Sequence, residues 1–228
     1  MKKESKIKLF WVSIYAIAMG FLEAAVVIYI RMIYYPNGFD FPLKWFGTNI
    51  LNIELIREFA TIIMLVSIVI LVGKKFYERF AYFIYAFAIW DIFYYIFLKL
   101  TLNWPPSFLT WDVLFLIPWA WVGPVITPIT CSILLVIMAL LIIRFQDKGK
   151  EISISSLEWC LFILGMILTL YTWLSDYSRL IFTGNPEVYK LISTYIPTDY
   201  NWILFYVGIL LVVVGITAFY ERERKSKH

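Results

Sequence analysis

Long apolar runs separated by short polar segments are the dominant pattern along this chain. A helix needs about 20 consecutive apolar residues to cross roughly 30 Å of hydrocarbon. The second apolar run is short, and it reaches full length only if Glu54, Arg57 and Glu58 belong to the same helix. We therefore predict an all-α integral membrane protein, in which residues 1–228 form one polytopic domain of six transmembrane helices. The predicted spans are about 9–30, 54–73, 79–99, 123–144, 157–178 and 200–220.

The region before the fourth predicted span does not read as a simple helix. It joins an apolar run that is too long for one perpendicular span, and three prolines interrupt it, at Pro118, Pro124 and Pro128. One interpretation is a Pro-broken interfacial or re-entrant segment at about 111–122, because irregular backbone is tolerated in a membrane where protein covers it. The other is a long, tilted helix kinked at proline. The sequence leaves both open.

Composition agrees with the pattern of spans. Hydrophobic residues make up 62% of the chain and aromatic residues 20%, whereas a soluble domain is about 45–50% apolar. A soluble globular protein is therefore excluded as a class. The net charge of +4 needs no nucleic-acid partner to explain it, because the basic residues lie where membrane topology places them.

Lysine and arginine are distributed unequally between the two sides of the predicted bundle. Six residues fall on one side, at Arg31, Lys44, Arg57, Lys99, Arg179 and Lys190. Fourteen fall on the other side, at Lys2, Lys3, Lys6, Lys8, Lys74, Lys75, Arg79, Arg144, Lys148, Lys150, Arg222, Arg224, Lys225 and Lys227. Cytoplasmic loops carry the excess of basic residues, so both termini are predicted to be cytoplasmic. We expect a multi-pass protein of a plasma membrane, the bacterial-type cytoplasmic or inner membrane.

Two acidic residues fall inside predicted spans at similar depth. Glu23 and Asp91 each lie seven residues before the outward end of their helix, which is about 10 Å along the axis at 1.5 Å per residue. A carboxylate in the bilayer costs about 2.5–3.5 kcal/mol on insertion scales. Such residues usually mark a functional site, although a protonated acid that only hydrogen-bonds neighbouring helices is the structural alternative.

Further polar and aromatic residues gather near the same outward end. Arg57 either pairs within its own helix or turns toward one of the intramembrane acids, and a solvated interfacial cluster is the alternative. Seven of the ten tryptophans fall at or beyond outward ends, so they either wall a pocket or anchor the interface. Acids beside aromatic rings suit a cation. The candidate ligand-binding residues are Glu23, Asp91, Arg57, Glu58, Asp112, Tyr95 and Trp119.

Small residues four apart mark one face of the first predicted helix. Ala16, Gly20 and Ala24 share this face with Glu23, and such spacing permits close helix packing. The face therefore turns Glu23 into the bundle. It is also the expected contact if the chain forms a homo-oligomer or binds a partner membrane subunit.

Motifs of known chemistry are missing from the sequence. It contains no glycine-rich phosphate loop, HExxH helix, GxSxG elbow or paired CxxC. The one histidine is His228, so a site built on buried imidazole is not expected. We expect no resident metal and no cofactor.

Three functions fit these features. The first is a membrane protein that binds or transports a small solute or cation through an outward-facing acidic and aromatic pocket. The second is an intramembrane enzyme that acts on a lipid or isoprenoid-linked substrate with paired carboxylates as acid and base; it requires Glu23, Asp91 and Asp112 to face one reacting centre. The third is a structural or assembly subunit of a membrane complex.

Overall fold

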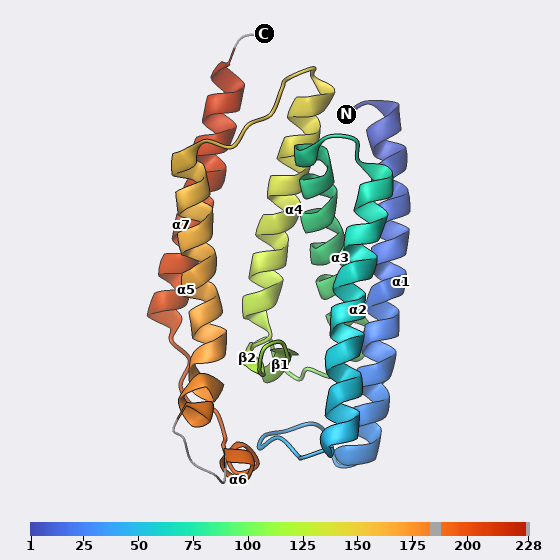
Figure 1. The fold of residues 1–228 in the computed structure, drawn as a ribbon, viewed down its shortest axis with the longest axis vertical. Coiled ribbons are helices and arrows are strands. Elements are labelled where there is room, and N and C mark those ends of the chain that lie inside the picture. The colour runs from blue at the N-terminus through green and yellow to red at the C-terminus, as the bar shows by residue number, and fades with distance from the viewer. Residues whose placement is uncertain (183–187, 227–228) are drawn as a thin grey trace.

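The computed structural model describes residues 1–182 and 188–226, and helices dominate it (Figure 1). Lys227 and His228, which entered the predictions above, lie outside the described residues. The elements in chain order are α1 (Lys3–Tyr34), α2 (Thr48–Val72), α3 (Phe76–Leu102), β1 (Trp111–Phe115), β2 (Trp121–Pro124), α4 (Ile126–Asp147), α5 (Ser156–Ile181), α6 (Val188–Ile192) and α7 (Trp202–Lys225).

Six of these helices, α1 to α5 and α7, are long and apolar enough to cross a membrane. The prediction of six spanning helices is therefore confirmed at this level, and the chain is a multi-pass membrane protein. Each helix overlaps one predicted span. The largest differences are at the starts of α1 and α2, which begin at Lys3 and Thr48, each six residues before the predicted span. Glu54, Arg57 and Glu58 thus belong to the same helix as the apolar run that follows them.

The helices form two groups joined through α4 (Figure 1). In one group α3 packs extensively against α1 and α4 and also contacts α2, and in the other α5 packs along α7. Both termini lie at the same end of the bundle, which we call the termini end. The opposite end, which carries the 35–47 loop and α6, is called the distal end.

Glycine allows α1 and α3 to touch backbone to backbone. A Cβ atom added at Gly20 would lie 2.9 Å from the Trp90 carbonyl oxygen, so any side chain there would push the helices apart. Ala16 and Ala24 are fully buried on the same helix. The small-residue face is therefore covered within the chain, and another subunit would have to use a different surface.

Residues 111–124 form a β-hairpin. β1 pairs with β2 in antiparallel register, with Asp112 opposite Gly123 and Val113 opposite Val122. This extended segment differs from the alternative of one long, proline-kinked helix, because strands replace its outward third and α4 begins only at Ile126. The ladder satisfies the main-chain polar groups that face each other across the two strands, and backbone within a membrane protein requires such partners. The depth of the hairpin in the bilayer stays a prediction.

One local signal at the termini end is a capping box at the start of α5. The Ser155 hydroxyl accepts a hydrogen bond from the Glu158 main-chain N–H, and the Glu158 carboxylate accepts one from the Ser155 N–H at 2.8 Å. The spacing of serine and glutamate predicts this motif. The same carboxylate accepts a bond from Arg222 Nε at 2.8 Å, which ties the start of α5 to the end of α7.

Candidate functional site

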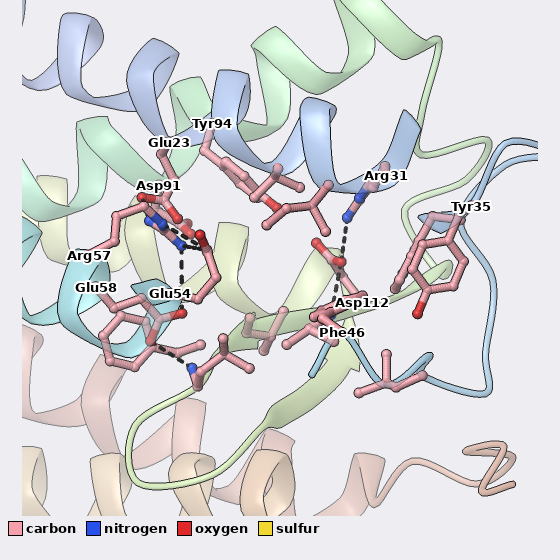
Figure 2. A pocket seen from close by; sticks show the side chains of 18 of the residues that line it. Glu23, Arg31, Tyr35, Phe46, Glu54, Arg57, Glu58, Asp91, Tyr94 and Asp112 are labelled. Atoms are coloured by element: carbon pink, nitrogen blue, oxygen red, sulfur yellow. Dashed lines mark hydrogen bonds and ion pairs between the residues drawn. The ribbon is translucent and has the colours of Figure 1, made fainter. Parts of the chain in front are cut away.

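A cavity of about 130 Å³ lies toward the distal end, enclosed by α1, α2, α3, the 35–47 loop and the hairpin (Figure 2). We call it the distal cavity. Its apolar and aromatic wall includes Val27, Ile30, Tyr35, Phe39, Leu43, Phe46, Trp90, Tyr94 and the hairpin residues 113–116. Its charged lining consists of Glu23, Arg31, Glu54, Arg57, Glu58, Asp91 and Asp112.

Helical periodicity brings the charged side chains to the cavity. Glu23 and Arg31 lie eight residues apart on α1, and Glu54, Arg57 and Glu58 follow spacings of three and four on α2. Residues at these spacings share one face of a helix. Two faces that each carry acidic and basic residues therefore meet where α1 and α2 run side by side (Figure 1).

Arg57 is the centre of an ion-pair cluster. Its Nη1 donates to the Glu23 carboxylate on α1, and its Nε donates to Glu54 Oε2 at 2.8 Å (Figure 2). The Arg57 Nη2 also lies 2.7 Å from Glu54 Oε2 and 4.0 Å from Glu58 Oε1. Charged groups that leave water need such partners, because burial alone strongly disfavours them. One guanidinium thus serves three carboxylates.

Arg31 and Asp112 form a second, separate ion pair. Arg31 Nη2 donates to Asp112 Oδ1 at 2.8 Å, and the two side chains are only 6% and 1% exposed. The guanidinium carbon lies 3.8 Å from the ring centroid of Trp104 and 4.3 Å from that of Phe39, within cation-π range. Among the described residues, Arg31 Nη1 has no hydrogen-bond partner. This pair fastens β1 to the last turn of α1.

Asp91 and Glu58 lack the close contact with a guanidinium group that the other acids of the lining have. Asp91 Oδ2 accepts a hydrogen bond from the Ser132 hydroxyl of α4 at 2.7 Å, and no described cation lies in ion-pair contact with it. Glu58 Oε2 accepts a bond from the Leu116 main-chain N–H at 2.9 Å. Both carboxyl groups line the cavity, so they are the acids available to a bound cation.

Two ionisable groups of the cavity lie outside the helical spans. Burial raises the pKa of the Asp112 carboxyl to about 6, while the nearby Arg31 guanidinium acts to lower it. Burial also raises the pKa of Tyr35, whose hydroxyl oxygen accepts a bond from the Lys44 main-chain N–H at 2.7 Å. Tyr35 is thus a neutral member of the lining.

The structure brings five of the seven candidate residues together. Glu23, Arg57, Glu58, Asp91 and Asp112 all line the distal cavity, although they come from four different elements. Their role in binding stays a prediction.

The other two candidates lie elsewhere. Tyr95 is buried next to Tyr94, with ring centroids 4.9 Å apart, and packs behind the lining. The Trp119 indole donates to the Ser178 hydroxyl of α5 at 3.0 Å. Neither side chain belongs to the cavity lining in the described part of the chain.

Sequence reasoning passed over several lining residues. Arg31 was treated only as a topology marker, although its position eight residues after Glu23 placed it on the same face. Trp90, which directly precedes Asp91, was not a candidate. Tyr94 lies three residues after Asp91, where helical spacing lets its phenol reach that carboxyl, and it also lines the cavity. Among the described residues, Trp90 is the one tryptophan that lines the distal cavity. The seven distal tryptophans are not part of the described lining, although Trp104 stacks on the lining residue Arg31.

The described lining therefore contains five carboxyl groups and only two guanidinium groups. No group of three or more His, Cys, Asp or Glu among the described residues is arranged to hold a metal ion. The volume is also below the roughly 300–1,000 Å³ of pockets for drug-sized molecules. What the arrangement can accommodate is a small cation, a proton or a few water molecules.

Comparison of this chain with models of protein families, with curated proteins and with solved structures gives no match.

Proposed function

We propose that this multi-pass protein binds a small cation, or the cationic group of a small solute, in the distal cavity. The observation that carries the proposal is the excess of carboxyl groups over guanidinium groups around a single cavity. Unpaired carboxylates in a low-dielectric site are costly, so a bound cation or protons must offset the remaining negative charge. Asp91 and Glu58 are the binding groups, because Arg57 and Arg31 already engage the other acids most closely.

The aromatic wall supports the same ligand class. Trp90, Tyr94 and Phe46 line the cavity beside the acids, and aromatic faces attract cations through the ring quadrupole. The cavity volume of about 130 Å³ limits the ligand to an inorganic cation or a small amine.

The enzyme alternative has one supporting observation. Glu23, Asp91 and Asp112 do line a common cavity, as acid–base catalysis with paired carboxylates requires. However, Glu23 pairs with Arg57 and Asp112 pairs with Arg31. An acid that must give or take a proton is poorly served by a fixed cationic partner, because the partner stabilises the ionised form alone. Cation binding is therefore the better account.

The direct test is a cation titration of the purified protein in mild detergent. We expect sodium, potassium or methylammonium chloride, added at constant ionic strength, to raise the thermal unfolding midpoint of the wild type. A ligand at 100 times its Kd stabilises the folded state by about 2.7 kcal/mol. Asp91→Asn should remove the shift, because it removes a carboxylate that has no cationic partner in the described structure. Native mass spectrometry of the same samples would identify any adduct.

Asp199→Asn is the matched control, because Asp199 is an exposed acid at the distal end and does not line the cavity. Its cation response should equal that of the wild type. A response of equal size in wild type and Asp91→Asn would refute the proposal. A phospholipid or isoprenoid that co-purifies with the wild type alone would favour the enzyme instead.

The proposal also includes an orientation in the membrane and transport of the bound cation. Thirteen of the fourteen basic residues assigned to the cytoplasmic side are described, and they all belong to segments at the termini end. By the positive-inside rule this end faces the cytoplasm of a bacterial-type plasma membrane, and the distal cavity opens to the outside. Charge movement across proteoliposomes on addition of the bound cation, lost in Asp91→Asn, would establish transport beyond binding.

A further inference from the structure

A second hollow lies at the termini end, between the last turns of α4 and α7. Its volume is about 430 Å³ and it is partly open to the surface. We call it the basic hollow. It is lined by Arg144, Phe145, Lys148, Lys150, Tyr220, Arg224 and Ser226.

The charge in the basic hollow has a single sign. Four of its lining residues are cationic, and no described acidic residue belongs to the lining. Arg224 is partly neutralised, because its Nη2 lies 2.8 Å from Glu221 Oε2. By contrast, the Arg144 guanidinium and the Lys148 ammonium make no ion pair with any described residue. Lys150 makes no ion pair with a described acid either, so three of the four cations face the hollow without a counter-charge.

Its walls are held in place by contacts of their own. Lys150 Nζ donates to the Glu223 main-chain oxygen and, at 2.7 Å, to the Ser226 main-chain oxygen, so the segment after α4 is fastened to the end of α7. The Lys148 and Lys150 ammonium groups lie 5.7 and 5.6 Å from the ring centroid of Phe145. Phe145 itself is buried. The two ammonium groups therefore lie beside a buried aromatic ring.

Ordinary topology explains only part of this arrangement. Basic residues are favoured at helix C-termini by the macrodipole and on the cytoplasmic side by the positive-inside rule. Those effects predict basic residues spread over the helix ends, as at Lys3 and Lys6 near the start of α1. They do not predict four cations around one hollow of a size typical of ligand pockets.

We propose that the basic hollow binds a phosphate-bearing anion. Arg144 supplies a planar fork that matches two phosphate oxygens, Lys148 adds a point charge, and the Ser226 hydroxyl adds a neutral donor. The position at the ends of two spanning helices places the hollow at the membrane surface, where anionic phospholipid headgroups are concentrated. A phospholipid headgroup and free phosphate share this chemistry, and the test separates them. The inference is independent of cation binding in the distal cavity.

The experiment uses the delipidated full-length protein in mild detergent. Native mass spectrometry would measure binding of phosphatidylglycerol and of phosphatidylcholine, and thermal unfolding would measure the response to inorganic phosphate. We compare wild type with the double variant Arg144→Gln, Lys148→Gln. The control is Lys3→Gln, Lys6→Gln, which removes the same charge at the same end from exposed side chains outside the hollow.

We expect the wild type to prefer phosphatidylglycerol over phosphatidylcholine. The double variant should lose about tenfold or more of that preference, because it removes two cations that face the hollow without an ion pair and that would bond the phosphate oxygens directly. The control should change it less than twofold. A selective response to inorganic phosphate that requires Arg144 and Lys148, without lipid preference, would identify free phosphate as the ligand.

Two results would overturn the proposal. One is a wild type that neither prefers the anionic lipid nor responds to phosphate. The other is an equal loss in the double variant and the control, which would reduce the effect to net charge. If the double variant fails to fold, Arg144→Gln alone gives the same comparison, because that exposed side chain holds no described ion pair.

Discussion

In the distal cavity both guanidinium groups contact carboxylates, whereas in the basic hollow three of the four cations make no ion pair with a described acid. The difference follows burial. Arg31 is 5% exposed, while Arg144 and Lys148 are exposed to solvent. Water and salt screen an exposed charge, but a buried charge depends on the protein for its neutralisation. The chain therefore has buried ion pairs at the distal end and exposed cations, most of them without an acidic partner, at the termini end.

This contrast predicts which substitutions should lower the stability of the fold and which should change only ligand binding. In the interlocked cluster, removal of one member leaves its partners uncompensated, so stability should fall. In the exposed patch, removal of one cation leaves no partner charge uncompensated, so only ligand binding should change. The following four predictions test this comparison.

Arg57→Gln should have the largest effect. It leaves Glu23 and Glu54 without the guanidinium that both contact, and removal of one partner of a buried pair costs about 3–5 kcal/mol. We expect a loss of about 4 kcal/mol in the free energy of unfolding, measured by reversible denaturation in mixed micelles. A loss below 1 kcal/mol would show that water neutralises the cluster.

Asp112→Asn should cost somewhat less, about 3 kcal/mol, because it strands one buried guanidinium instead of two carboxylates. Arg31→Gln should cost a similar amount. The double variant should cost clearly less than the sum of the two, since neither charge is then left alone. Additive losses in this double-mutant cycle would contradict a direct ion pair between the hairpin and α1.

Gly20→Ala disturbs the distal cavity without changing any charge. The added Cβ would lie 2.9 Å from the Trp90 carbonyl oxygen, so α1 must move from α3 at a cost of about 1–3 kcal/mol. Gly165→Ala is its counterpart on α5, where the Cβ would lie 2.7 Å from the Gly208 carbonyl oxygen. Both variants should lose stability, but only Gly20→Ala should weaken cation binding, because Glu23 is one turn away. Equal binding losses would indicate general loosening of the bundle.

Lys75→Gln should have the smallest effect. It breaks the Lys75–Glu151 pair, whose side chains are 78% and 91% exposed and 3.3 Å apart. Exposed pairs contribute about 0–1 kcal/mol, so we expect a change of at most about 0.5 kcal/mol that vanishes in high salt. A loss as large as that of Arg57→Gln would mean that burial does not govern these ion pairs.

The helical period explains why much of the candidate site was accessible from the sequence. Glu23 and Asp91 lie seven residues from the ends of their predicted spans, and α1 and α3 do pack together, so equal depth was a sound signal. Arg57 could be placed on the α2 face with Glu54 for the same reason. Periodicity is a local property, and it needs no knowledge of the fold.

The hairpin was not accessible in this way. Prolines between two apolar runs fit a re-entrant loop, a kinked helix or a pair of strands equally well, because proline only removes a donor and restricts the backbone. The pairing of Asp112 with Arg31 joins positions 81 residues apart, and no periodicity links them. Trp119 was misplaced for this reason too, since the hairpin turn carries it toward α5.

The ion-pair cluster around Arg57 also bears on biosynthesis. Its contacts with Glu23, Glu54 and Glu58 come from α1 and α2 alone, which precede the other described spanning helices along the chain. The guanidinium in the first half of the second helix therefore finds one of its carboxylate partners in the helix that precedes it. The two helices can form this cluster in the bilayer without a contact from the hairpin, α3 or any later segment.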